Sequence, residues 1–359
     1  MRIFKDSDRI ILISLLILFS LSLSMIWSLA PQLFVHQLTS LVLGLVLLFI
    51  FSRLEIELLG GFSWLIYIFS LLFLLSTFVF GQVSRGAIRW IEIGNFTLQP
   101  SELIKPFMIL FFANFLTESE RISPRKMMSS ALLLFPILFL VFKQPDLGSS
   151  LVILTSWLGV IFAAGLPILS LLAITILFLI ISPLIWFFLK NYQKERILSF
   201  LNPYQDPLRA GYHVIQSMIA IGSGGIFGWG LGRGSQSQLL FLPERHTDFI
   251  FASLVEELGL IGGFLLLLAY ALLFYRILRI SQQSTSRLGQ IFCLGFFSQL
   301  VFQVFVNIGM NMGLMPITGI TLPLVSYGGS SLVATLIGLG IVMSLGRFKI
   351  SRTETLEIK

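Results

Sequence analysis

Ten long apolar runs, nearly free of charged residues, divide this sequence and limit what it can fold into. Inside lipid the chain itself must satisfy every backbone N–H and C=O, and about 20 apolar residues in an α-helix cross a bilayer. The runs cover approximately residues 10–30, 32–52, 62–81, 102–118, 128–143, 147–165, 167–189, 249–275, 288–310 and 326–346. We therefore predict an all-α polytopic membrane protein, with ten transmembrane helices in a single domain of residues 1–359.

The composition excludes a soluble domain. Hydrophobic residues make up 56% of the 359 residues and charged residues only 11%, whereas about 25% of a typical soluble domain is charged. The first run follows Arg2, Lys5 and Arg9, as a signal peptide would, but it is longer than a signal-peptide core and has no obvious small-residue cleavage site, so we expect it to remain as a span. The single cysteine, Cys293, lies inside the ninth run, so one chain can form neither a disulfide nor a thiolate metal site.

The basic residues indicate how the spans are oriented. Lys and Arg are concentrated in the segments on the side of the N-terminus, whereas the short connections on the other side hold only Arg85, Arg89 and Lys143. Because basic residues near spans are retained in the cytoplasm, both termini are predicted to be cytoplasmic. This topology explains most of the net charge of +7, and nucleic-acid binding is not implied.

One outward-facing connection, residues 190–248, is much longer than the others. Loops of this length are usually functional or disordered, and its low charge argues against disorder. Residues 211–225 predict a short helix in the membrane interface, and the glycine-dense residues 222–234 match neither common nucleotide-binding glycine motif. In a second outer connection, residues 82–101, we expect the apolar side chains to enter the headgroup region while Arg89 stays in water.

Three ionisable residues lie at the outer ends of predicted spans, where charge is costly and therefore informative. Glu102 and Lys105 are three positions apart, so on a helix they share a face and can pair. Asp146 begins the sixth run from the same outer face. A structural salt bridge and a role in binding are equally open interpretations of these residues.

The segment FLPERHTDFIF, residues 241–251, places Glu244, Arg245, His246 and Asp248 directly before the eighth span. A lone Asp at this position would be interpreted as a helix cap. Asp248 is not alone, because two further carboxylates, those of Glu256 and Glu257, lie within the span, and Glu256 is expected near the helix face of Asp248. The cluster therefore indicates a functional site at the outer mouth of the bundle.

The ninth and tenth runs flank a stretch, residues 306–332, in which polar residues and glycines interrupt the apolar pattern. They include Asn307, Asn311 and Ser326. Irregular backbone at membrane depth is tolerated only where it lines protein or water. We interpret the stretch as the wall of a polar cavity rather than as a simple kinked hairpin.

These motifs together resemble the SEDS family (shape, elongation, division and sporulation). The resemblance rests on QPSELIKP, KQPDLGSS, GYHVIQSMIAIGSGGIFGWGLGRG, FLPERHTDFIF and GMNMGLMPITGITLPLVSYGGSSL, and it extends over about residues 82–345. The short termini are similar to those of the RodA branch. The resemblance implies ten spans, with both ends inside, in the bacterial inner membrane, in agreement with the hydropathy and the charges.

The resemblance also implies a function. Members of the family polymerise lipid II into the glycan strands of peptidoglycan, beside a class B penicillin-binding protein that cross-links them and other proteins of the elongation machinery. The Asp of the TDFIF motif, Asp248 here, is the essential catalytic residue of the family. Glu102, Lys105 and Asp146 match polar residues that line the family's central cavity.

The chemistry of this reaction agrees with a single carboxylate. Forming a β-1,4 link from an α-linked diphosphate donor inverts the anomeric carbon in one displacement, and the acceptor hydroxyl needs a positioned base, which we assign to Asp248. The diphosphate leaves as a stable anion, so a second carboxyl that donates a proton is not needed. Its charge could be neutralised by Arg245, Arg209, Arg233 or Lys105, or by a divalent cation such as Mg²⁺ or Mn²⁺ held by Asp248 and Glu244. The other residues predicted to bind substrate are Arg209, Arg233, Glu244, Arg245, His246 and Ser326, and no organic cofactor is expected.

Two other functions fit the same spans. A transporter would move lipid II across the bilayer through the polar cavity, and a scaffold would mainly dock the transpeptidase. The charged segment at the outer face favours the enzyme over both.

Overall fold

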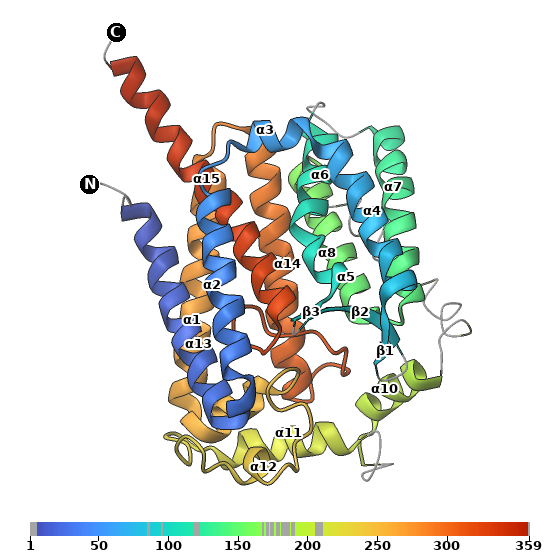
Figure 1. Ribbon diagram of the computed structural model, residues 1–359, viewed down its shortest axis with the longest axis vertical. Coiled ribbons are helices and arrows are strands. Elements are labelled where there is room, and N and C mark those ends of the chain that lie inside the picture. The colour runs from blue at the N-terminus through green and yellow to red at the C-terminus, as the bar shows by residue number, and fades with distance from the viewer. Residues whose placement is uncertain are drawn as a thin grey trace.

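The computed structural model describes residues 6–84, 87–94, 96–117, 123–166, 191–204 and 211–357, together with residues 169, 172, 176, 180 and 187. Over these residues the protein is a bundle of long helices, with a small sheet and three shorter helices at one end (Figure 1). Both termini lie at the opposite end of the bundle, near α3 (Figure 1). This arrangement agrees with two termini on one side of a membrane and the long loop on the other.

The elements follow the apolar runs closely. The helices of the first half are α1 (Asp6–Leu29), η1 (Pro31–Leu33), α2 (Phe34–Phe51), α3 (Ile56–Gly61), α4 (Ser63–Phe80), α5 (Pro100–Leu103), α6 (Lys105–Thr117), α7 (Pro124–Lys143) and α8 (Leu147–Ala163). Those of the second half are α10 (Asn191–Leu201), α11 (Tyr212–Ser223), α12 (Ser235–Gln238), α13 (Ile250–Gln283), α14 (Arg287–Asn311) and α15 (Gly329–Glu357). The helix predicted within residues 211–225 is therefore confirmed as α11.

Seven stretches in the described part of the chain are long and apolar enough to cross a membrane. They are Arg9–Leu29, Pro31–Phe51, Ser63–Phe80, Pro124–Lys143, Ile250–Gln283, Arg287–Asn311 and Gly329–Gly346. Two further predicted spans correspond to shorter helices, α6 with 13 residues and α8 with 17. The seventh predicted span, residues 167–189, lies largely outside the described residues. The multi-pass membrane fold is thus confirmed, and the count of ten spans stays a prediction.

The helix α15 forms the centre of the bundle, where it packs along α2 and against α13 and α14. Its apolar stretch is 89% buried, whereas that of α2 is 22% buried. Small residues allow this close packing: a methyl group on Gly340 would lie 2.7 Å from the carbonyl oxygen of Leu48, and one on Gly44 would lie 2.5 Å from Leu336. No hydrophobic driving force acts between helices in lipid, so close contact of this kind stabilises their packing.

The all-α prediction needs one correction, because the connection of residues 82–98 forms a three-stranded antiparallel sheet. Its strands are β1 (Gln82–Ser84), β2 (Ala87–Ile93) and β3 (Phe96–Leu98), in the order β1-β2-β3. The sequence of β2, AIRWIEI, is rich in β-branched and aromatic residues, which favour strands. We had interpreted this stretch only as an interfacial loop.

The helix α13 is broken at Gly259, which has φ 68° and ψ −169°. The break frees backbone groups that a continuous helix would pair with each other, and the glycine-rich loop before α13 satisfies them. Trp229 N and Gly230 N donate to the carbonyls of Glu256 and Glu257, at 3.1 and 2.9 Å. On the other side of the break, the N–H groups of Leu260 and Ile261 donate to the carbonyls of Gly225 and Ile226, at 2.9 and 3.3 Å. Broken helices in membranes persist where neighbouring backbone restores such bonds in this way.

Gly259→Ala is expected to destabilise the protein by about 3 kcal/mol, because backbone angles of this kind are nearly restricted to glycine. A methyl group there would also lie 2.3 Å from Ile226 O. The matched control is Gly222→Ala in α11, where a methyl group meets nothing within 4 Å and where alanine favours a helix by about 0.5–1 kcal/mol. Thermal melting of both variants in detergent should therefore shift in opposite directions, and equal shifts would contradict this interpretation.

Candidate functional site

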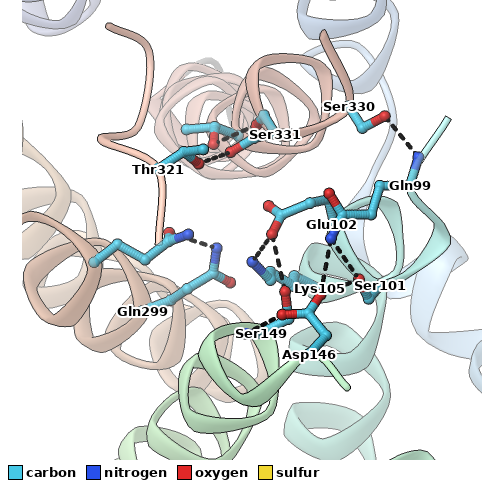
Figure 2. Close-up of polar contacts among 12 residues, drawn as sticks. Gln99, Ser101, Glu102, Lys105, Asp146, Ser149, Gln299, Thr321, Ser330 and Ser331 are labelled. Carbon is cyan, nitrogen blue, oxygen red and sulfur yellow. Dashed lines mark hydrogen bonds and ion pairs between the residues drawn. The ribbon is translucent and has the colours of Figure 1, made fainter. Parts of the chain in front are cut away.

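Glu102, Lys105 and Asp146, which the sequence grouped only by type and depth, lie together where α5, α6 and α8 meet (Figure 2). Lys105 Nζ lies 2.5 Å from Glu102 Oε1, and the Lys105 side chain is almost completely buried. The predicted pairing of Glu102 with Lys105 is therefore confirmed. Ser149 Oγ donates a further hydrogen bond of 3.2 Å to the same carboxylate oxygen and ties the pair to α8.

The carboxylate of Asp146 has several donors around it (Figure 2). It accepts hydrogen bonds from Gln99 Nε2 at 2.8 Å, from Ser101 Oγ at 3.2 Å and from the backbone N–H of Ser149 at 3.1 Å, which makes it the N-cap of α8. Arg89 Nη1 lies 3.8 Å from its Oδ1. These donors fix the position of the buried carboxylate at the start of α8.

Sequence reasoning missed the role of Arg89, which we had expected to stay in water. The strand β2 carries it over the end of α8, where its side chain is only 30% exposed and its Nε is buried without a hydrogen-bond partner among the described residues. The strand-forming composition of residues 87–93 was the available signal, since a strand holds a side chain in place where an irregular loop would not.

A second polar group forms around the TDF sequence before α13, where two asparagines of α14 fix the backbone. Asn307 Nδ2 and Asn311 Nδ2 each donate to the carbonyl oxygen of Asp248, both at 3.0 Å. Asn311 Oδ1 in turn accepts from Ala252 N at 3.1 Å. The backbone at Asp248 is thus fixed by side chains that are themselves buried and hydrogen-bonded.

The two residues before Asp248 are fixed by the segment between α14 and α15. Ser326 Oγ donates to Thr247 O at 2.6 Å, and Tyr327 N donates to His246 O at 2.9 Å. Three consecutive carbonyls, those of residues 246, 247 and 248, therefore accept hydrogen bonds from residues 307–327. These hydrogen bonds fix the backbone from which the Asp248 side chain extends.

Asp248 lies directly before the first residues of α13. The N-cap of α13 is Phe249, and no side-chain hydrogen bond caps this helix. Asp248 is therefore not the N-cap residue of α13. Its carboxylate lies beside Gly319 instead: a methyl group on Gly319 would lie 3.6 Å from Asp248 Oδ2 and 4.0 Å from Arg196 Nη1.

Arg196, on α10, is the second residue that sequence reasoning missed. We had counted it only among the basic residues of the long loop, where nothing in the local pattern separates it from its neighbours. Its effect also reaches His213, which stacks on Phe249 with ring centroids 6.1 Å apart. Burial lowers the pKa of His213, the charge of Glu244 opposes this, and the charge of Arg196 reinforces it. Arg196 thus acts on His213 and lies beside the same glycine as Asp248. We call Arg196, His213, Glu244 and Asp248 the Asp248 cluster.

The segment of residues 312–328 connects the Asp248 cluster with the Asp146 side of the bundle. Within this segment, Gly319 lies beside Asp248. A methyl group on Gly148, two residues after Asp146, would lie 2.8 Å from Thr318 O, so α8 packs directly on this segment. Figure 2 shows Thr321 and Ser331 across from Glu102, joined by a hydrogen bond of 3.1 Å. Both groups of polar side chains thus border the same irregular segment. That residues 306–332 form the wall of a polar cavity stays a prediction.

Three comparisons with known proteins indicate the same family. The family model of the FtsW/RodA/SpoVE cell cycle proteins matches residues 7–351. The peptidoglycan glycosyltransferase MrdB of Escherichia coli K12 is 42% identical over 343 residues, which cover 94% of this chain and 93% of MrdB.

The chain belongs to the FtsW/RodA/SpoVE family.

Solved structures of the FtsW/RodA/SpoVE family share its fold. A chain of a peptidoglycan synthase complex that coordinates polymerization and crosslinking superposes with a TM-score of 0.82, at 36% identity, over 94% of this chain and 97% of that one. The rod shape determining protein RodA of Thermus thermophilus superposes with a TM-score of 0.70, at 32% identity, over 94% of this chain and 96% of that one.

Several residues that we predicted to bind substrate have structural contacts in this FtsW/RodA/SpoVE chain. Arg245 donates to the carbonyls of Ser237 and Leu29, and burial lowers its pKa while Glu257 opposes this. Ser326 is buried between Thr247 O and Leu322 N. Arg233 is exposed on the glycine-rich loop. The ring of His246 lies against the ring of Tyr327, with centroids 5.7 Å apart. Arg209 lies outside the described residues. Substrate binding by these residues stays a prediction.

A divalent cation in this FtsW/RodA/SpoVE chain would have few protein ligands. Among the described residues, no three His, Cys, Asp or Glu side chains form a group that could hold a metal ion. Glu244 and Asp248 supply two carboxylates, and Glu244 Oε2 already accepts from Thr247 Oγ1 at 3.0 Å. Mg²⁺ is commonly held by one or two carboxylates plus substrate phosphates and water. The donor set therefore fits a cation that arrives with a diphosphate.

Proposed function

We propose that this chain is a peptidoglycan glycosyltransferase that polymerises lipid II into glycan strands during cell elongation. Relatives that cover nearly the whole chain carry this activity in their names, MrdB of Escherichia coli among them. The observation that carries the proposal for this chain is the fixed backbone of residues 246–248, which holds the Asp248 carboxylate beside Gly319, where the Arg196 guanidinium also lies.

In this reaction the Asp248 carboxylate acts as the general base. The 4-hydroxyl of the acceptor sugar attacks the anomeric carbon of the donor, and its proton passes to Asp248. The bond from the anomeric carbon to the diphosphate breaks, and its electron pair leaves with the diphosphate. One displacement converts the α-link into a β-link, so a single carboxylate is sufficient.

The leaving diphosphate needs positive charge beside Asp248, and the Arg196 guanidinium is in the position to provide it. A guanidinium presents several N–H donors in a fixed plane, which suits a diphosphate oxygen pair. Glu244 and Asp248 would hold a divalent cation, which would neutralise further charge on the diphosphate when bound. Lys105, whose ammonium is paired with Glu102, would bind substrate only by exchanging that partner.

The proposed location is the bacterial inner membrane, with both termini in the cytoplasm and the Asp248 cluster outside. The termini lie at one end of the bundle and α10, α11 and α12 at the other, which supports this orientation (Figure 1). A class B penicillin-binding protein is the proposed partner. The similarity to a chain from a peptidoglycan synthase complex that couples polymerization to crosslinking supports it.

The test is polymerisation of purified lipid II by the purified chain in vesicles, with and without the transpeptidase partner, and with Mg²⁺, Mn²⁺ or a chelator. Glycan polymer that depends on the chain is the expected result, and loss of polymer in chelator would support the cation. Movement of labelled lipid II across the vesicle membrane without any polymer would favour the transporter instead.

Arg196→Gln is expected to lower kcat/KM for lipid II polymerisation by about 100-fold, since it removes a charge from the diphosphate site. Arg196→Lys should keep part of the activity, because it keeps the charge but loses the planar donor geometry. Lys194→Gln, which removes the same charge from the same helix, is the matched control and should stay close to wild type. Equal effects of the Arg196 and Lys194 substitutions would show that only the general charge of α10 matters.

A further inference from the structure

We propose that residues 224–241, called here the apolar loop, are seated in the outer leaflet of the bilayer, with their apolar side chains among lipid acyl chains. The predictions above treated this stretch only as a shaped glycine-rich loop outside the membrane. The exposed surface of the loop contacts lipid, and this contact fixes the height of α13 in the membrane.

The exposed surface of the apolar loop is strongly hydrophobic. Phe227 is 79% exposed, Leu240 69%, Ile226 60% and Trp229 58%. In the sequence of residues 224–241 the only charged side chain is Arg233. A patch of this kind on a protein surface indicates contact with a partner or a membrane.

The apolar loop is a built structure whose polar groups point inward. The fully buried carboxylate of Glu256 accepts from the backbone N–H groups of Gln236 and Ser237, at 2.7 and 3.0 Å. The equally buried carboxylate of Glu257 accepts from Gln238 Nε2 at 2.7 Å and from Ser28 Oγ at 2.6 Å. These two glutamates, of which we expect Glu256 near the helix face of Asp248, therefore anchor the loop, and its apolar side chains remain on the outside.

The depth of the apolar loop follows from the helices that hold it. Residues 258–275 of α13 carry no charge and extend over about 27 Å at about 1.5 Å per residue, close to the ~30 Å of a bilayer hydrocarbon core. The outer boundary of the core therefore lies near Glu257. The apolar stretch of α1 ends at Leu29, and the contact of Ser28 with Glu257 places the boundary at the same level from a second helix.

The base of the apolar loop lies at this boundary. Gly225 O and Ile226 O accept from Leu260 and Ile261, which are about one turn inside the predicted core. Leu260 and Phe264 on the same helix are 63% and 68% exposed, so the exposed surface of the loop continues into the lipid-facing surface of α13. Figure 1 shows the loop, in yellow to gold, around the ends of α1 and α13 that lie far from the termini. This continuity is what identifies the occupant as lipid.

The consequence for catalysis rests on the proposed function. The apolar loop and the TDF sequence are joined through Leu242, which is fully buried, so a loop held in the outer leaflet holds Asp248 at the level of the headgroups. That is the level at which a lipid-linked diphosphate presents its reacting bond. Trp229 fits this depth, because tryptophan favours the interface between hydrocarbon and water.

The depth can be measured without reference to activity. In a Cys293→Ala background, single cysteines at Phe227→Cys and Leu240→Cys carry a nitroxide spin label, with Phe264→Cys as the lipid reference and Glu195→Cys as the water reference. The chain alone is placed in vesicles of phosphatidylethanolamine and phosphatidylglycerol, and label accessibility to oxygen and to a water-soluble nickel chelate is compared. Labels at 227 and 240 should resemble the label at 264. Labels that resemble the one at 195, or that are shielded from the chelate only when the transpeptidase partner is added, would overturn the proposal.

A functional readout tests the height of Asp248. The double variant Phe227→Asp, Leu240→Asp places charge on the proposed lipid surface and should lower polymerisation in vesicles by about tenfold or more, since small displacements of reacting groups are costly. Phe227→Leu keeps the surface apolar and should remain close to wild type, and a retained melting temperature shows that the double variant is folded. Full activity of the double variant would refute the role in positioning. If the wild type makes no polymer, the proposed function fails, and the spin labels still decide the depth.

Discussion

Replacing Asp248 by Asn is expected to reduce the rate of glycan polymerisation by about 10³-fold, because a general base within reach of the reacting hydroxyl typically contributes 10²–10⁴-fold. The amide has nearly the same shape as the carboxylate but cannot accept the acceptor's proton. The bonds from Asn307 and Asn311 go to the backbone carbonyl of Asp248, so they are unchanged by this substitution. The melting temperature should therefore stay close to that of the wild type.

The control for this experiment is Glu195→Gln, which removes an exposed carboxylate from α10, the helix that also carries Arg196. It should leave polymerisation nearly unchanged. Initial rates with purified lipid II, measured beside thermal melting, separate loss of the base from loss of the fold. An Asp248→Asn variant that folds and polymerises at the wild-type rate would remove the base assignment, and the family membership would be unaffected.

The second large effect is expected for Lys105→Met, which leaves the Glu102 carboxylate without its cation. Side-chain exposure is 2% for Lys105 and 12% for Glu102, so the carboxylate has little access to water. Removing one partner of a buried ion pair typically destabilises a protein by about 3–5 kcal/mol. Thermal melting in detergent should show a large decrease for this single variant.

The matched control is the double variant Glu102→Gln, Lys105→Met, which removes both charges and should recover most of the lost stability. This cycle also separates the two interpretations that the sequence left open. If the pair is only a structural salt bridge, the recovered stability should bring recovered polymerisation. If the pair binds substrate, stability returns but polymerisation does not. A single variant that is as stable as the double variant would show that the buried pair contributes nothing.

The residues of the site differ in how far local sequence could predict them. Glu102 and Lys105 pair because they are three residues apart on helical turns, which is a local property. The approach of Arg89 to Asp146 joins a strand to a helix 57 positions later in the chain, and it depends on a sheet that we did not predict. Arg196 and Asp248 lie beside the same glycine, Gly319, only because α10 folds back toward the segment between α14 and α15. No local pattern encodes such an approach.

For other charged residues, only the structure shows which groups they contact. Glu256 and Glu257 lie within a predicted span, where a carboxylate needs a partner or a wet cavity. The partners turned out to be backbone and side-chain donors of the chain's own loop, together with Ser28 of α1. Arg245 is predicted to neutralise charge on the diphosphate, and in the structure it donates to two backbone carbonyls. Its binding of substrate stays a prediction. The charge of a residue and its depth in the membrane are thus not sufficient to show whether it belongs to a functional site.

By itself, the sequence determined the class of protein, the positions of most helices and the family, because lipid forces apolar residues into long helices and the motifs are local. Only the tertiary structure decided that α15 is the central helix, that Gly259 breaks α13 and that a loop replaces the missing hydrogen bonds. Only the tertiary structure placed Arg196 and Asp248 beside the same glycine, Gly319. The reason is physical: hydropathy and helical spacing act along the chain, whereas packing and hydrogen bonding between distant segments depend on where the whole chain has already placed them.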